Sequence, residues 1–261
     1  VIENVLKNVL EVNPVLFRGK PLVLAEEQKE AVLQAITSPL SIVTGGPGTG
    51  KTSVALTILR VHKMLGLAER PALVAPTGRA ANRMSESVIN GLNSIKDLNK
   101  LKHDTELLKF AADAKTLHRL LGYHLNRHSF RHHEYDPLEH DLLIIDEGSM
   151  IDQELMVRLL RASYSKLPYL LPVKRIVILG DSQQLPSVGN GSVLIELTGD
   201  SDHSGANCYE NPVPVVKLVK NYRQKISDTA GRNILGVASI VNEMGIDPCP
   251  ELLFEAESPD S

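Results

Sequence analysis

Tryptophan is absent from this chain, and aromatic residues make up only 4% of its 261 residues. Any surface that stacks flat ligands must therefore use a few phenylalanine, tyrosine and histidine side chains. The two cysteines, Cys208 and Cys249, lie far apart, which argues against a disulfide framework or a cysteine metal clip and favours a reducing, cytoplasmic location. No apolar run reaches the roughly 18 residues of a membrane helix, and no signal peptide is recognisable, so we expect no membrane partner.

The charge of the chain is nearly balanced, with a formal net charge of −3. This balance gives no support for a strongly basic nucleic-acid binder, although a local stripe of Lys and Arg could still line a groove. Hydrophobic residues make up 43% of the chain, which is enough for a substantial core. The length allows one large α/β domain or two small ones.

Short apolar runs alternate along the chain with segments of helical periodicity. This alternation predicts an α/β fold in which helices cover both faces of a parallel sheet. A proline in the last apolar run favours an edge position for that strand. The expected strands are 40–44, 71–75, 141–145, 174–179 and 213–218, and the expected helices include 25–36, 54–59 and 151–162.

The most informative segment runs from Gly45 to Thr52 and fits the pattern G-x-x-x-x-G-K-[ST] of a phosphate-binding P-loop. Its glycines allow backbone N–H groups to surround phosphate oxygens, and the following helix adds partial positive charge. Lys51 would reach the β- and γ-phosphates of ATP, and the Thr52 hydroxyl would ligate Mg²⁺. The alternative is a glycine-rich turn that only caps a helix. The predicted ATP-binding residues of the loop are Gly45, Gly46, Pro47, Gly48, Thr49, Gly50, Lys51 and Thr52.

Two acidic residues directly follow the expected strand 141–145. Asp146 is placed to hold Mg²⁺, usually through water, and Glu147 to orient and deprotonate an attacking water molecule. The alternative is that an acidic or serine residue here simply caps the next helix. A P-loop upstream in the same chain favours the catalytic interpretation.

Three further polar residues are candidates for the same site. Gln184 follows a strand that ends in Gly180-Asp181 and could contact the γ-phosphate, although a surface turn would look similar. Arg223 could neutralise charge on the transferred phosphoryl group, or it could be a solvated strand-end arginine. The amide of Gln28 can donate and accept at once and so matches the edge of adenine, whereas the alternative is a surface helix glutamine.

These motifs occur in the order found in superfamily-1 helicases, and from about residue 25 to 245 the sequence resembles the RecD family, the alpha subunit of exodeoxyribonuclease V (RecBCD). Gly148 departs from the family, whose members more often carry alanine there. The segments that carry the resemblance are Gln28, Gly45–Thr52, Pro76–Ala81, Thr116–Gly122, Asp146–Met150, Gly180–Pro186 and Asn221–Arg223.

The resemblance implies a RecA-like motor domain of a helicase that uses ATP hydrolysis to translocate 5′-to-3′ on single-stranded DNA. It further implies duplex ends as substrates, RecB- and RecC-like subunits as partners, and a role in recombinational double-strand break repair. It assigns Lys51, Glu147, Gln184 and Arg223 to catalysis and Gln28 to adenine. The residues it places on single-stranded DNA are Pro76, Thr77, Gly78, Thr116 and His118, and the alternative for the two threonines is helix capping and core packing.

Six of the nine histidines lie in residues 118–140. A zinc site, a DNA-facing hairpin over about 123–137 and a plain solvated loop are the three interpretations, and the absence of a nearby cysteine counts against zinc. For domain organisation we expect the end of a preceding region in residues 1–20, the first motor domain in 21–245, and a tail in 246–261 without a second motor domain. The motifs leave open a P-loop kinase, a non-catalytic docking subunit of a RecBCD-like complex and a stand-alone RecD-like helicase.

Overall fold

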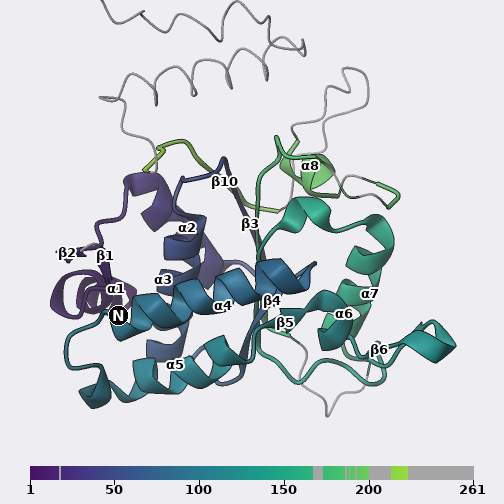
Figure 1. Cartoon of the computed structure of the whole chain (residues 1–261), viewed down its shortest axis with the longest axis horizontal. Coiled ribbons are helices and arrows are strands. Elements are labelled where there is room, and N and C mark those ends of the chain that lie inside the picture. The colour runs from purple at the N-terminus through teal and green to yellow at the C-terminus, as the bar shows by residue number, and fades with distance from the viewer. Residues whose placement is uncertain are drawn as a thin grey trace, which may run out of the picture.

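We describe the protein from a computed structural model (Figure 1). The structure describes residues 1–17, 19–166, 173–185, 187, 189–191, 193–199 and 213–222. Arg223, both cysteines, most of the expected loop 198–212 and the expected tail all lie outside these residues.

A six-stranded sheet forms the centre of the domain, in the order β10-β3-β9-β8-β4-β5. Every neighbouring pair in it is parallel, so all its carboxyl ends meet at one edge. The predicted α/β fold with a parallel sheet is therefore confirmed, and among the described strands the last one lies at an edge, as predicted. The strands are β3 (Leu40–Gly45), β4 (Pro71–Ala75), β5 (Lys115–Thr116), β8 (Leu142–Ile145), β9 (Arg175–Gly180) and β10 (Val215–Leu218).

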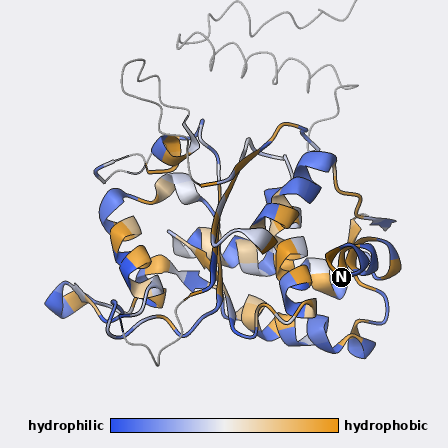
Figure 2. Ribbon diagram, turned by 180° about the vertical axis from the view of Figure 1, so that it is seen from behind, coloured by the Kyte–Doolittle hydropathy of each residue, from blue (hydrophilic) through white to orange (hydrophobic). Residues whose placement is uncertain are grey.

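Alternate residues of the central strands face two separate cores, as the period-two geometry of a strand requires. In β8, Leu142 and Ile144 pack into one core, and Leu143 and Ile145 pack into the other. All four are fully buried, which explains why this strand reads as a continuous apolar run. Figure 2 shows the strands as an orange band between helices that carry both orange and blue residues.

Helices cover both faces of the sheet (Figure 1). The larger core lies under one group of helices, which are α1 (Ile2–Lys7), α2 (Glu26–Thr37), α3 (Lys51–Met64), α4 (Gly78–Asn93) and α5 (Lys102–Ala112), with the short helical segments η1 (Asn8–Val12) and η2 (Leu98–Lys100). The smaller core lies under the other group, which is α6 (Leu117–Leu120), α7 (Gln153–Ser163) and α8 (Val193–Thr198), and the short η4 (Gly148–Met150) precedes α7. No described helix is both long enough and apolar enough to cross a membrane.

Two small antiparallel pairs lie outside the main sheet. β1 (Leu16–Phe17) pairs with β2 (Lys20–Pro21) near the N-terminus. β6 (Tyr123–His124) pairs with β7 (Ser129–Phe130), and the turn between them contains the short segment η3 (Leu125–Arg127). This second pair is the hairpin expected over 123–137, with shorter strands, and it projects from the body of the domain beside α6 (Figure 1).

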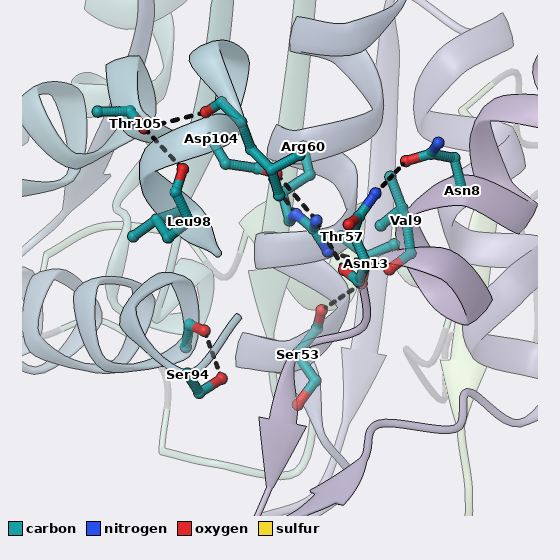
Figure 3. A network of polar contacts seen from close by, with 12 residues as sticks. Asn8, Val9, Asn13, Ser53, Thr57, Arg60, Ser94, Leu98, Asp104 and Thr105 are labelled. Atoms are coloured by element: carbon teal, nitrogen blue, oxygen red, sulfur yellow. Dashed lines mark hydrogen bonds and ion pairs between the residues drawn. The ribbon is translucent and has the colours of Figure 1, made fainter. Parts of the chain in front are cut away.

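A buried ion pair joins the back of the P-loop helix to α5 and to the N-terminal segment (Figure 3). The guanidinium of Arg60 donates to both carboxylate oxygens of Asp104, at 2.7 and 3.0 Å. It also donates to the carbonyl oxygens of Val9 (3.0 Å) and Asn13 (2.9 Å). Residues 1–13 are therefore fixed to α3 by hydrogen bonds as well as by apolar contacts.

Candidate nucleotide site

The P-loop leaves β3 at Gly45 and enters α3 at Lys51, as the strand–loop–helix pattern predicts. Gly48 and Gly50 have φ angles of 85° and 88°, in the left-handed region that glycine adopts without strain. A side chain at Gly50 would also place its Cβ only 2.5 Å from Nε2 of Gln28. The sequence therefore needs glycine here for two reasons, backbone conformation and the close approach of a neighbouring side chain.

The ammonium group of Lys51 folds over the loop that precedes its helix. Its Nζ donates to the carbonyl oxygens of Gly45 (2.5 Å) and Gly46 (3.1 Å). Phosphate oxygens form stronger, charge-assisted hydrogen bonds with ammonium groups than neutral carbonyls do. The half-buried Thr52 lies beside Lys51 in the first turn of α3, where its hydroxyl could join a Mg²⁺ coordination sphere.

Asp146 and Glu147 end β8 at the same edge of the sheet. The backbone N–H of Asp146 donates to the carbonyl of Val74 in β4 (2.9 Å), and the Asp146 carboxylate accepts from the N–H of Glu147 (2.9 Å). Glu147 has a φ of 54°, so the chain turns sharply between the two carboxylates. The helix cap expected at this position is instead Asp152, which accepts from the N–H of Leu155 (2.7 Å) and starts α7.

The positive charge of Lys51 acts on both of these carboxylates. Burial raises the pKa of Asp146, and the N–H of Glu147 and the positive charge of Lys51 oppose the rise. Burial also raises the pKa of Glu147, the charges of Asp146 and Asp181 add to the rise, and Lys51 again opposes it. A carboxylate with a raised pKa is a stronger base, which is the property expected of a group that takes a proton from water.

The turn after β9 completes this edge of the sheet. Asp181 is 4% exposed and its carboxylate accepts from the N–H of Gln183 (3.1 Å). Ser182 contacts Thr44 of β3 through its N–H and its hydroxyl, both at 3.3 Å, so the turn is attached to the strand that carries the P-loop. The predicted residue Gln184 lies on this turn with an exposed side chain.

Gln28 is buried against the P-loop, at 3% exposure. Its Nε2 donates to the carbonyl of Thr49 (2.9 Å), and its Oε1 accepts from the N–H of Ala25 (3.0 Å). The alternative of a surface glutamine is therefore wrong. Both ends of the amide contact backbone, so reading adenine with it remains a prediction.

The residues predicted to contact DNA lie at the carboxyl ends of β4 and β5. Ala75 pairs with Thr116, which brings the two loops side by side. The hydroxyls of Thr77 and Thr116 accept from backbone N–H groups at the starts of α4 and α6, both at 3.2 Å, so the capping alternative describes both. Pro76 is half-buried next to Thr77, and Gly78 is exposed.

His118 belongs to an aromatic cluster at the base of the hairpin. Its ring lies 5.4 Å from that of Tyr123 and 5.8 Å from that of Phe130. These contacts fix the hairpin to α6 and leave His118 itself exposed. Within the described part of the chain, no group of three or more His, Cys, Asp or Glu residues is arranged to hold a metal ion.

Two residues of this edge were not predicted as site residues. The positive charge of Arg83 on α4 lowers the pKa of both Asp146 and Glu147. The only feature of the sequence that could have pointed to Arg83 is its spacing of four residues from Arg79. Glu27 accepts hydrogen bonds from the backbone of residues 219 and 220. No sequence signal distinguishes Glu27 from Glu26.

Site and fold together define a P-loop ATPase domain of RecA-like architecture, with a phosphate loop after one strand and two carboxylates after another strand of the same parallel sheet. Residues 28–190 match the family described as an AAA domain, so the chain belongs to that family.

The chain is homologous to RecD and RecD2 proteins across this domain. It is 42% identical over 171 residues to the RecBCD enzyme subunit RecD of Haemophilus influenzae, covering 65% of this chain and 26% of that protein. It is 35% identical over 201 residues to the ATP-dependent RecD2 DNA helicase of Deinococcus radiodurans, covering 77% of this chain and 22% of that protein. The chain thus spans about a quarter of the length of these relatives.

A likeness to a solved structure concerns the fold alone. The large terminase of bacteriophage HK97 superposes with a TM-score of 0.52 at 12% identity, covering 93% of this chain and 53% of that protein.

Proposed function

We propose that this chain is the first motor domain of a RecD-type DNA helicase, which couples ATP hydrolysis to 5′-to-3′ movement along single-stranded DNA. The observation that carries the proposal is that the P-loop with Lys51 follows β3, and Asp146 and Glu147 follow β8, at the carboxyl edge of one parallel sheet. The loops of Thr77 and Thr116 lie on the same edge, at the ends of β4 and β5, which are the next two strands after β8. A structural change at the bound nucleotide could therefore reach the proposed DNA contacts through neighbouring strands of one sheet.

The donor set at this edge fits ATP and Mg²⁺. Mg²⁺ keeps several waters and is usually bound through one or two carboxylates together with substrate phosphates, which matches Asp146 with the hydroxyl of Thr52. The bound ion would neutralise phosphate charge. Lys51 would exchange its carbonyl contacts for phosphate oxygens, and Glu147 would accept a proton from the attacking water. Gln184 would contact the γ-phosphate.

Several roles rest on homology and motif order rather than on described contacts. They are phosphoryl-charge neutralisation by Arg223, adenine recognition by Gln28, and DNA contacts by Pro76, Gly78 and His118. Assembly with RecB- and RecC-like subunits, action at duplex ends in double-strand break repair, and a cytoplasmic location belong to the same proposal. So does the expectation that residues 21–245 alone hydrolyse ATP slowly, because a second motor domain would complete the γ-phosphate site.

Phosphate release measured on the full-length protein tests the proposal. We expect turnover to rise when a 5′-tailed duplex is added, and Lys51→Ala to abolish it while leaving the melting temperature without nucleotide unchanged. A P-loop kinase would respond to a nucleoside acceptor and not to DNA, so DNA-independent turnover would refute the helicase function. Co-purification with RecB- and RecC-like partners would separate a complex subunit from a stand-alone helicase.

A further inference from the structure

Three consecutive carbonyl groups of the P-loop are held by hydrogen bonds from outside the loop. Nδ2 of Asn221 donates to the carbonyl of Pro47 (3.0 Å), and the backbone N–H of Tyr222 donates to that of Gly48 (2.8 Å). Nε2 of Gln28 donates to the carbonyl of Thr49 (2.9 Å). The donors belong to two segments: Gln28 lies in the first turn of α2, and residues 221 and 222 lie at the end of the described chain.

These bonds have a direct consequence for the phosphate-binding side of the loop. Each peptide unit is planar and trans, so its N–H points away from its carbonyl. Because their carbonyls are held from outside, we expect the N–H groups of Gly48, Thr49 and Gly50 to point toward the interior of the loop, where the N–H of Thr49 donates to the carbonyl of Gly46 (3.4 Å). Converging backbone N–H groups of this kind form the concave site that binds phosphate anions.

One carboxylate ties the two donor segments together. Oε1 of Glu27 accepts from the backbone N–H groups of Val219 (3.3 Å) and Lys220 (3.1 Å), just before Asn221 and Tyr222. Glu27 precedes Gln28 in the first turn of α2 and is half-buried. The negative charge of Glu27 also contributes to the raised pKa of Tyr222, after burial of the phenol.

The position of β10 explains why such a tie is needed. β10 is an edge strand that pairs only with β3 in the described sheet, and Leu218 at its end lies opposite Gly45 at the start of the P-loop. Residues 219–222 follow this end and cross to the loop. Edge strands are attached on one side only, so the segment beyond β10 depends on contacts such as those from Glu27 to keep its register over the P-loop.

We propose that Glu27 is a positioning residue for nucleotide binding, which holds residues 219–222 on the P-loop carbonyls and so preorganises the phosphate cradle without touching the nucleotide. This inference rests on the proposed ATP-binding function. It predicts that Glu27 affects the phosphate part of the ligand and not the base.

The test measures dissociation constants of the full-length protein for MgATP and for inorganic tripolyphosphate with Mg²⁺, the latter by competition with a fluorescent ATP analogue. We expect Glu27→Ala to weaken both ligands by a similar factor of about three- to ten-fold, the size of a modest hydrogen-bond contribution. Glu27→Gln keeps the acceptor oxygen and is expected to restore affinity to within about two-fold of wild type. Glu26→Ala is the matched control, since Glu26 is one residue away, 89% exposed and paired with Lys29.

A second variant allows the inference to be tested even if Glu27→Ala lowers the stability of the protein. Asn221→Ala removes the contact to Pro47 directly. The double variant with Glu27→Ala should lose less affinity than the product of the two single fold-losses, because both residues act through the segment 219–222. Equal affinity of Glu27→Ala and wild type would overturn the inference alone. Loss of ATP affinity with unchanged tripolyphosphate affinity, or a Glu27→Gln variant as weak as Glu27→Ala, would also overturn it. A wild-type protein that binds neither ligand would overturn the proposed function as well.

Discussion

The buried ion pair behind the P-loop helix gives a stability prediction whose size follows from the structure (Figure 3). The side chains of Arg60 and Asp104 are 1% and 4% exposed. Asp104→Ala removes both oxygens that face the guanidinium and leaves its charge buried, with only the carbonyls of Val9 and Asn13 as partners. Breaking such a pair on one side costs about 3–5 kcal/mol. That is a large share of the roughly 5–15 kcal/mol by which a domain is stable.

Urea denaturation of the nucleotide-free protein measures this loss as a change in unfolding free energy. Arg60→Met should cost a similar amount, because it leaves the Asp104 carboxylate buried without its cation. The double variant Arg60→Met, Asp104→Leu should recover most of the loss, since apolar groups of similar volume can replace a buried pair at little cost.

An exposed ion pair on the same protein provides the control. Arg70 and Glu139 lie 3.8 Å apart with side chains 53% and 84% exposed, and Glu139→Ala should change the unfolding free energy by less than about 1 kcal/mol. If Asp104→Ala costs no more than Glu139→Ala, or if the double variant is as unstable as the two single losses added together, the reasoning about the buried charge is wrong.

Three further predictions concern the nucleotide site. Asp146→Asn should raise the melting temperature at neutral pH without Mg²⁺, because burial raises the pKa of Asp146 and so penalises its ionised form in the folded state. This gain should shrink as the pH falls through the raised pKa, where the wild-type carboxyl group also becomes neutral. A gain in melting temperature that does not depend on pH would contradict this reasoning. Glu147→Gln should keep ATP affinity within about two-fold and lower single-turnover hydrolysis by at least about 100-fold, as expected for loss of a general base, whereas unchanged hydrolysis would remove Glu147 from that role. Gly148→Ala would place a Cβ 2.4 Å from Cγ2 of Ile178 and should cost about 1–3 kcal/mol in urea denaturation. Combined with Ile178→Ala, which removes that Cγ2 methyl group, it should cost less than the two single losses added together.

Local sequence patterns predicted the elements whose identity depends on their own residues. The strand 71–75 was predicted with its final bounds, because five buried residues between turn signals allow little else. The P-loop followed from glycines that the backbone itself requires at φ angles of 85° and 88°. Short elements were missed: β5 has only two residues, and the six-residue α8 depends on Leu194 packing into the smaller core.

The roles of single polar side chains were harder to predict. Thr77 and Thr116 were assigned to DNA by resemblance, and the structure shows each capping a helix, which the same residue type explains equally well. Gln28 is predicted to read adenine, and the structure adds contacts of its amide with the backbone of Thr49 and Ala25 that the sequence did not reveal. Composition and spacing do not reveal a partner that lies far away in the chain.

The sequence by itself determined the motifs of this protein: a P-loop, two carboxylates after a buried strand, and a parallel sheet to carry them. These features depend on local backbone preference and on the period of apolar residues, which act over a few neighbouring positions. Only the tertiary structure decided that Glu27 meets residues 219 and 220, almost 200 positions away, and that Arg60 meets Asp104. Contacts of that kind exist only after the strands have taken their order in the sheet, because strand order, and not distance along the chain, brings the two segments together.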